Sequence, residues 1–375
     1  MISELSGVSR ETVSHILGGK FADRYKESTR AKVLEIAAQL NYRPHRGAQA
    51  MKSGRSKLIA IAHSGMGIEA AEKANLTLSR IIHEKGYDYL ALDMNWLGGC
   101  TERTITEIIR SRVEGVLISH VQGAFNDRHI DELRHAGIPT VSVNGIRRPN
   151  VPLFCDNLVK AFREMTEHLV GLGHRCILLP VVDPRELAEG VGRTTHDRIE
   201  GFRSAIQACG EWLMVSEEEF LNEGVRLLRG SSRRRPKVLG VTIVQTLEAY
   251  TRLDKPVYRF CKKLIEQDVL PDALMCVNDL YAMEAIAAAL EYKIEIPKRL
   301  AVTGYDNDRI GEFPCFGITT AQQDTEGMCR AAVEMLIKLI DNPETPWENR
   351  LFDSRLIVRT SCGAGAKAGA RRNRG

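Results

Sequence analysis

The sequence predicts an α/β protein made of a small N-terminal three-helix module and a larger body of two similar lobes. Two observations carry this prediction. In residues 1–44, apolar side chains recur at helical spacing in three short segments. From residue 57 onward, short apolar runs alternate with amphipathic stretches, which is typical of parallel sheets covered by helices on both faces. The chain of 375 residues is long enough for two or three domains.

The first two helices are predicted over residues 1–6 and 9–17, with a tight turn at Gly7 between them. Ser9 stands at the N-cap position of the second, where its hydroxyl can accept from the unpaired amides of the first turn. One side of this helix is apolar and the other polar, with Val13, Ile16 and Leu17 opposite Arg10, Glu11, Ser14 and His15. This is a helix-turn-helix pattern, although a helical cap on a larger domain would carry the same apolar stripe.

A third helix is predicted over residues 28–40. Ser28 is its expected N-cap, and Asn41 and Pro44 are expected to end it. Its apolar stripe follows helical spacing through Val33, Ile36, Ala37 and Leu40. Three small helices with such stripes can share one core.

The body divides into two sets of alternating elements. The first lobe is predicted to contain strands over 57–64, 87–93, 113–120 and 138–145, and helices over 70–86, 101–112 and 130–137. The second lobe is predicted to contain strands over 176–182, 237–244, 272–278 and 299–306, and helices over 158–175, 196–210, 260–271 and 279–292.

Charge is distributed unevenly along the chain. The net charge is +4, but residues 1–57 hold 11 Lys/Arg against 5 Asp/Glu, and residues 363–375 hold four basic residues and no acidic one. A basic small module on a mildly acidic body suits binding to a phosphate backbone, because displaced counterions drive such binding. The Gly- and Ala-rich residues 363–375 are predicted to be a disordered basic tail.

Several classes of protein are disfavoured. No apolar run approaches the roughly 18 residues of a membrane span, and the N-terminus lacks the layout of a signal peptide, so a cytoplasmic location is expected. The nine cysteines are scattered without a C-x-x-C pair, which predicts neither disulfides nor a zinc site. Phosphate-binding glycine loops and hydrolase motifs are missing, so we expect no cofactor, no metal and no catalysis.

Polar residues at predicted strand ends are the candidates for binding a small molecule, since ligands of open α/β sheets lie beyond the carboxyl ends of the strands. They are His63, Ser64, Asn144, Asp156, Asn278, Asp279 and Asp306. Two lobes that face each other would enclose a small polar molecule and close on it by a hinge. Asn278 and Asp306 could instead cap the helices that follow them.

Seven stretches now appear in one order along the chain. They are "SGVSRETVSHIL", "STRAKVLEIAAQLNYRPHRGAQAM", "GHR", "RIEGF", "DALMCVND", "RLAVTGYDN" and "TTAQQD". In this order and spacing the sequence resembles the LacI/GalR family of bacterial transcriptional regulators, from residue 1 to about residue 362. The resemblance implies a helix-turn-helix DNA-binding domain over 1–44, a hinge helix or linker over 45–57, and over 58–362 a two-lobed effector-binding and dimerisation domain similar to periplasmic sugar-binding proteins.

The resemblance also implies how DNA is bound. Residues 9–17 match the recognition helix, which enters the major groove, and Arg10, Glu11 and His15 match base-contacting positions. Glu11 would also be favoured in a first helical turn without any DNA. The further implied DNA contacts are Ser9, Thr12 and Ser14 as caps or phosphate contacts, Met51 as the apolar minor-groove wedge where the family usually has Leu, and Arg46 and Arg55 on the phosphates beside it.

For the effector, Arg198, Asn278 and Asp306 match binding positions of the family, Asp156 lies near the expected crossing between lobes, and Gln323 is a weaker candidate. The implied protein is a homodimeric repressor on a near-palindromic operator, with a sugar or related metabolite as effector. The alternatives are a cytoplasmic sugar-binding protein or an enzyme on the same two-lobed fold.

The sequence departs from the family in two places. It begins inside the first helix, without the usual preceding residues and cap, so we expect the translated product to start upstream of Met1. Residues 210–258 are longer than usual for the family and include the basic run "SSRRRP". No functional residue is assigned there.

Overall fold

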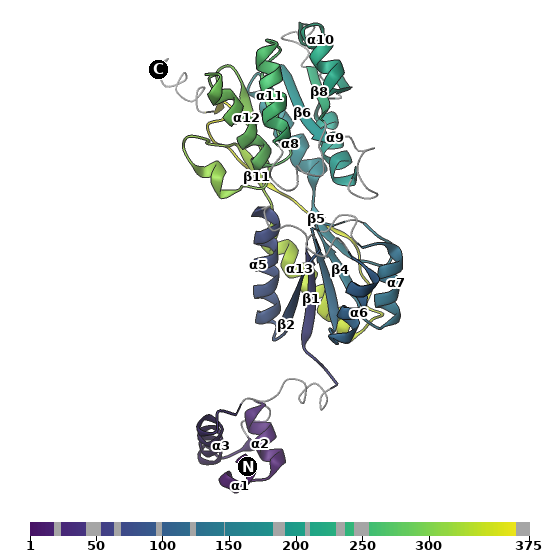
Figure 1. The fold of residues 1–375 in the computed structure, drawn as a ribbon, viewed down its shortest axis with the longest axis vertical. Coiled ribbons are helices and arrows are strands. Elements are labelled where there is room, and N and C mark those ends of the chain that lie inside the picture. The colour runs from purple at the N-terminus through teal and green to yellow at the C-terminus, as the bar shows by residue number, and fades with distance from the viewer. Residues whose placement is uncertain are drawn as a thin grey trace.

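A computed structural model describes residues 1–18, 24–42, 54–63, 69–94, 100–120, 125–145, 147–182, 192–206, 211–229, 237–243 and 255–364. Three bodies follow one another along the long axis, with the N-terminal helices at one end and two α/β lobes beyond them (Figure 1). The predicted fold class is confirmed: a three-helix module precedes two lobes, each built on a parallel sheet.

The N-terminal module consists of α1 (Ile2–Ser6), α2 (Arg10–Leu17) and α3 (Glu27–Gln39). They share a small core whose buried members are Ile2, Ile16, Val33 and Ala37. As predicted, the Ser9 hydroxyl caps α2 by accepting from the Thr12 N–H at 3.1 Å. The prediction of Ser28 as the cap of α3 is wrong. The chain already enters the helix at Lys26, whose carbonyl accepts from two following amides, so Ser28 lies inside the first turn.

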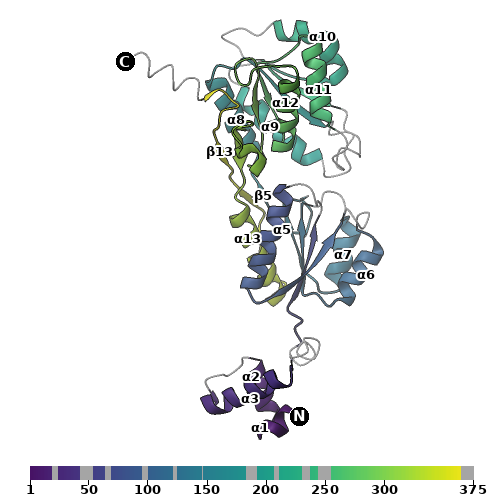
Figure 2. The same cartoon turned by 60° about the vertical axis from the view of Figure 1, so that its left-hand side comes forward.

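The N-terminal lobe holds a six-stranded parallel sheet in the order β12-β5-β4-β3-β1-β2. Its strands are β1 (Leu58–His63), β2 (Asp88–Asp93), β3 (Gly115–Ser119), β4 (Thr140–Val143), β5 (Leu153–Asp156) and β12 (Arg350–Phe352). Side chains of α5 (Glu69–Glu84) and α13 (Thr325–Asp341) pack on one face. Those of α6 (Glu102–Arg110) and α7 (Asp127–His135) pack on the other, so the sheet is buried on both faces (Figure 2).

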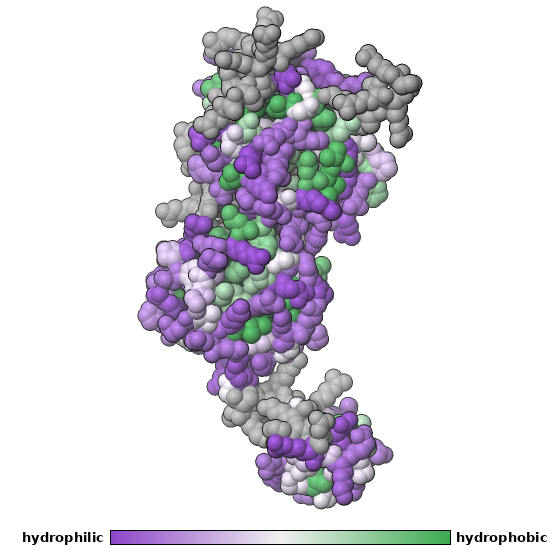
Figure 3. All heavy atoms as spheres, turned by 180° about the vertical axis from the view of Figure 1, so that it is seen from behind, coloured by the Kyte–Doolittle hydropathy of each residue, from purple (hydrophilic) through white to green (hydrophobic). Residues whose placement is uncertain are grey.

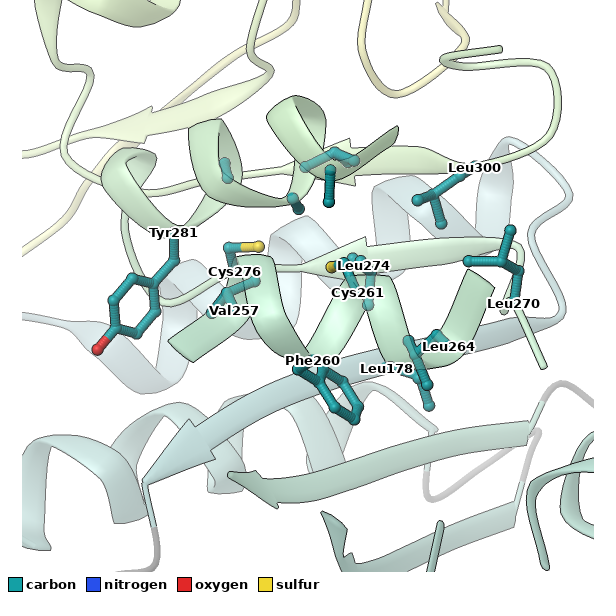
Figure 4. Close-up of a cluster of buried hydrophobic side chains, with 14 of the residues drawn as sticks. Leu178, Val257, Phe260, Cys261, Leu264, Leu270, Leu274, Cys276, Tyr281 and Leu300 are labelled. Carbon is teal, nitrogen blue, oxygen red and sulfur yellow. The ribbon is translucent and has the colours of Figure 1, made fainter. Parts of the chain in front are cut away.

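The C-terminal lobe repeats this plan with a five-stranded parallel sheet in the order β10-β9-β6-β8-β7. The strands are β6 (Cys176–Val182), β7 (Glu211–Ser216), β8 (Lys237–Ile243), β9 (Ala273–Met275) and β10 (Ala301–Thr303). One face is covered by α8 (Leu158–Gly171) and α9 (Gly192–Ile206), and the other by α10 (Glu217–Arg229), α11 (Pro256–Glu266) and α12 (Asp279–Glu291). Figure 4 shows Phe260 and Leu264 of α11 in the core of the second face.

Part of the long segment 210–258 is therefore ordinary sheet and helix. β7 forms the edge of the C-terminal sheet beside β8, and α10 follows it directly. No strand or helix was assigned to residues 211–229 from the sequence, because the isolated run "EWLMVS" carries no alternation that separates a strand from a short helix.

The chain crosses between the lobes at three places that lie side by side. β5 ends at Asp156 and α8 begins at Leu158, β11 (Thr320–Gln322) leads into α13, and β12 leads into β13 (Arg355–Ile357), which pairs with β11. Both α13 and β12 belong to the N-terminal lobe although they lie late in the sequence. The two lobes are thus not two consecutive halves of the chain.

The two helices on one face of the C-terminal sheet, α8 and α9, approach each other closely at Gly201. A Cβ atom there would overlap the carbonyl oxygen of Val159 and lie 3.0 Å from the Cβ of Phe162. We expect Gly201→Ala to lower the free energy of unfolding by about 1–3 kcal/mol, the usual cost of overpacking. Gly171→Ala on α8 is the matched control, since nothing lies within 4 Å of its Cβ. Urea unfolding of both variants checks the prediction, and equal stability of the two would contradict it.

Candidate functional site

The polar face of α2 is the first candidate surface. Arg10, Glu11 and Ser14 are exposed on it. Ser9 and Thr12 bond to each other, with 3.0 Å between their hydroxyl oxygens, in addition to the capping bond. These two side chains therefore hold the start of the helix, and the exposed side chains at its first turn point away from the core. The surface of this module that is drawn in Figure 3 is mostly hydrophilic.

His15 is partly buried beside the segment that leads into α3. Its Nδ1 lies 2.7 Å from the Tyr25 hydroxyl, and the two rings are 6.2 Å apart. Tyr25 thus orients the His15 ring on α2. Any contact of His15 with DNA must be compatible with this hydrogen bond.

The predicted hinge residues Arg46 and Met51 lie outside the described residues. Arg55 is described, and it is bound to the N-terminal lobe. Its guanidinium donates from Nε to Glu114 at 2.6 Å, from Nη2 to the Tyr87 hydroxyl at 2.7 Å and from Nη1 to Asp341 at 3.1 Å. The structure therefore places Arg55 in an ion-pair network of the N-terminal lobe, whereas the sequence predicted a phosphate contact.

The second candidate site lies where the chain crosses between the lobes. Asp156 ends β5, Asn144 follows β4, Gln323 follows β11 and Asp306 lies beyond β10. Asn144 Nδ2 lies within donating distance of Asp156 Oδ2 (3.1 Å) and Gln323 Oε1 (3.3 Å), and Gln323 Nε2 donates to Asp306 Oδ1 at 2.6 Å. This chain of hydrogen bonds, which we call the inter-lobe chain, joins polar strand ends of both lobes.

Two buried polar atoms near the inter-lobe chain are unsatisfied within the part of the protein that is described. They are Asp156 Oδ1 and Arg198 Nε. Arg198 on α9 lies with its guanidinium carbon 5.8 Å from the centre of the Phe162 ring, which orients it. Leaving a buried acceptor and a buried donor without hydrogen bonds is costly, and a ligand with hydroxyl groups could bond to both of these atoms.

The carboxyl groups of this site are shifted toward the neutral form. Burial raises the pKa of Asp156 to about 7, against the polar contacts with Asn144 and Tyr305 and the nearby positive charge of Arg198. Burial and the neighbouring carboxylates Asp308 and Asp279 raise the pKa of Asp306 as well, again opposed by Arg198. A carboxyl group accepts from hydroxyl groups, and in its protonated form it can also donate to them, so this site has the groups to bind a polar ligand.

Asn278 and Asp279 lie at the start of α12. Asn278 Oδ1 caps this helix by accepting from the Tyr281 N–H at 2.8 Å. The oxygen of Asn278 therefore has the capping role that was the alternative to effector binding. Asp279 is fully buried; its Oδ2 accepts from the Asp308 N–H at 2.8 Å, and burial raises its pKa to about 7. Asp279 thereby fixes the loop that carries Asp306. Of the other strand ends, His63 closes β1 and Ser64 lies outside the described residues.

His120, which follows β3, was not among the residues predicted for the site. Its Nδ1 lies 3.1 Å from the Ser119 hydroxyl and its Nε2 lies 3.3 Å from Asn144 Nδ2. Burial lowers the pKa of His120 to about 4, so it is neutral at pH 7. His120 lies at the end of a predicted strand, as Asn144 does. That position could have identified it as a candidate site residue from the sequence. Tyr305 was also missed; it is buried, with its hydroxyl 2.7 Å from that of Ser354.

Metal-binding clusters, cysteines and apolar helices are the other features that bear on function. No set of three or more His, Cys, Asp or Glu residues there is arranged to hold a metal ion. The eight cysteines within the described ranges are free thiols, and five of them are buried. None of the helices seen in these ranges is long and apolar enough to span a membrane. His174, just after α8, lies with its Nε2 2.9 Å from the Cys362 carbonyl oxygen.

Comparison with protein families decides the class of this chain. Residues 2–45 match the model of bacterial regulatory proteins of the lacI family. Residues 166–362, more than half of the chain, match the periplasmic binding protein-like domain, and residues 72–238 match the periplasmic binding proteins and sugar binding domain of the LacI family. The chain belongs to the LacI family. This family consists of regulatory proteins, which decides against an enzyme on the same fold.

The relatives of this LacI-family chain match it over nearly their whole length. The PurR transcriptional repressor of Glaesserella parasuis is 24% identical over 96% of each chain. The MalR regulator of Streptomyces coelicolor is 26% identical over 96% of this chain and 95% of its own. In fold, the Lac repressor dimer bound to operator and the anti-inducer ONPF matches 96% of this chain and 97% of its own, with a TM-score of 0.71 and 19% identity. A complex of the regulator CelR with cellobiose matches with a TM-score of 0.60 and 21% identity, over 96% of this chain and 98% of its own.

Proposed function

We propose that this LacI-family chain is a homodimeric transcriptional repressor in the bacterial cytoplasm. It binds a near-palindromic operator through α2, and a sugar or related metabolite bound between the lobes changes its affinity for that operator. The observation that carries the proposal is that one chain combines an exposed polar face on a capped α2 with an inter-lobe site holding two unsatisfied buried polar atoms. The polar face of α2 can contact base edges, and the inter-lobe site can bind hydroxyl groups.

Relatives of this fold support both parts. The solved Lac repressor is a dimer on operator DNA, and the solved CelR structure holds cellobiose. In this chain, large hydrophobic side chains are exposed on both lobes, including Leu76 on α5 (72% exposed) and Leu290 on α12 (59% exposed). Figure 3 shows green hydrophobic areas on each lobe. Exposed hydrophobic side chains of this kind suit contact with a second copy of the chain. The two N-terminal modules of such a dimer could then bind the two halves of a symmetric operator.

Selection of bound DNA from a random pool tests the DNA-binding part. The full-length protein is expected to recover a near-palindromic motif, and a panel of mono- and disaccharides is expected to contain one that changes its affinity for that motif. Recovery of no motif under any condition would overturn the proposal.

Within the site, Arg198→Met is expected to abolish the response to the active sugar while affinity for the selected operator stays within about twofold. The substitution keeps an unbranched stem but removes the guanidinium donors proposed to bind the effector. Fluorescence anisotropy of labelled operator with increasing sugar measures this. The matched control is Arg203→Met on the same helix, where the arginine is exposed and pairs with Glu200 at 2.6 Å. A normal sugar response in Arg198→Met would show that Arg198 does not hold the effector.

A further inference from the structure

The chain enters the N-terminal lobe through residues 55–58, and this segment is held to the lobe from several sides. The Ser56 hydroxyl donates to the Arg112 carbonyl at 2.6 Å, and the Lys57 N–H donates to Glu114 Oε1 at 2.7 Å. The Lys57 carbonyl accepts from the Asp88 N–H at 2.8 Å. Residues 55–58, which connect the N-terminal lobe to the DNA-binding module, are therefore fixed to the N-terminal ends of β2 and β3.

Arg55 extends this attachment to a helix. Its three guanidinium nitrogens bond to three separate elements: Glu114 just before β3, Tyr87 just before β2, and Asp341, the last residue of α13. Glu114 is only 11% exposed, whereas Arg55 is 36% and Asp341 59% exposed, so the network is sheltered from water at its Glu114 end. The planar fork of an arginine is suited to hold such partners in one relative position.

α13 connects this attachment to the inter-lobe site. It begins at Thr325, directly after its cap Asp324 and after Gln323 of the inter-lobe chain, and it ends at Asp341. Its 17 residues span about 25 Å as one helix. Its inward side packs tightly on the sheet, because a Cβ at Gly115 of β3 would lie 2.8 Å from the Leu336 side chain. α13 is therefore fixed to the N-terminal lobe, and it places Gln323 before one of its ends and Asp341 at the other within one rigid element.

We propose that Arg55 is a coupling residue that transmits the state of the inter-lobe site, through α13 and Asp341, to the segment that leads to the DNA-binding module. This rests on the proposed repressor function and adds a route of regulation to it. When the lobes change their closure, α13 and the N-terminal ends of β2 and β3 move together as parts of the N-terminal lobe, and Arg55 carries this movement into residues 55–58. Arg55 acts here through Asp341 and Glu114, in place of the phosphate contact expected from the sequence.

A phosphate contact and a coupling role for Arg55 predict opposite effects of the substitution Asp341→Asn on operator affinity. If Arg55 binds phosphate, removing the negative charge of Asp341 leaves DNA binding unchanged or strengthens it, because less acidic charge competes for the arginine. If Arg55 is a coupling residue, the same substitution loosens the segment and weakens operator binding. The sign of the effect therefore distinguishes them.

The test uses the full-length protein and the operator recovered by selection, with a scrambled duplex as the non-specific probe. We expect Asp341→Asn and Arg55→Met each to lower the ratio of operator to scrambled affinity by about 5- to 10-fold, in the range of allosteric couplings. The double variant is expected to lose no more than either single one, with an unchanged salt dependence. Glu334→Gln is the matched control, since it removes the same charge from α13 and breaks a 2.9 Å pair with Lys85 away from the linker.

If the wild-type protein binds its operator, either of two outcomes would overturn the coupling proposal. One is an Asp341→Asn variant with unchanged or increased operator affinity. The other is an Arg55→Met variant that weakens both duplexes alike and reduces the salt slope by about one contact per subunit, which would identify a phosphate contact. Thermal unfolding of all variants shows that a loss does not come from misfolding. If the wild type recovers no operator at all, the repressor function itself fails, and the coupling proposal fails with it.

Discussion

Arg10→Ala is expected to lower affinity for the selected operator by about 10- to 100-fold in each half-site, because a forked arginine contact to guanine contributes roughly 1–3 kcal/mol of discrimination. Arg10 is the first residue of α2 and is exposed, and the cap formed by Ser9 and Thr12 holds the turn from which it projects. The loss should be concentrated at one base pair of each half-site, where the variant accepts other bases. Anisotropy titrations with operators altered one base pair at a time measure both effects.

Lys32→Ala provides the control for this prediction. Lys32 is exposed on α3 of the same small module, so the substitution removes the same charge without altering α2. It is expected to reduce affinity for operator and scrambled duplex by a similar small factor. If Arg10→Ala behaved in the same way as Lys32→Ala, with no change in base preference, Arg10 would be a phosphate contact and α2 would be oriented differently in the groove.

Asp156→Asn is expected to stabilise the unliganded protein at pH 8 by on the order of 2–4 kcal/mol and to abolish the sugar response. The folded-state pKa of Asp156 is raised to about 7, well above the ordinary value of 3.8. Between these two values the folded state binds more protons than the unfolded state, so wild-type stability falls as the pH rises from about 4 to 7. Asparagine cannot ionise and keeps an acceptor for Asn144, so the variant escapes this loss.

Urea unfolding at pH 4.5 and pH 8 measures the difference between the two proteins. The gain from Asp156→Asn should be largest at pH 8 and fall to a minor part of that value at pH 4.5. Asp353→Asn is a control of opposite sign, because the hydrogen bond from Lys160 lowers the pKa of Asp353, so its carboxylate is favoured in the folded state at neutral pH. An Asp156→Asn variant that is less stable at pH 8 than wild type would show that the ionised carboxylate has a stabilising partner in the unliganded site.

Local interactions account for what could be predicted from the chain alone. The cap at Ser9 and the apolar stripe of α2 depend on residues three or four apart, so their spacing identifies them. The sheets could be predicted because parallel strands buried on both faces are apolar throughout. Polar residues at strand ends were expected to meet, and Asn144, Asp156 and Asp306 do lie along one inter-lobe chain with Gln323. The order of the motifs then indicated the LacI family.

What the chain alone could not indicate are the partners brought together by folding. An arginine beside a linker has the same local pattern whether it binds phosphate or a carboxylate. For Arg55 the partners are Glu114, 59 residues away, and Asp341, 286 residues away. Likewise, only the return of α13 to the first sheet places its two ends at the inter-lobe site and at the linker. Such contacts form between segments distant in sequence, and their free energy depends on burial and geometry that exist only once the three crossings between the lobes are made.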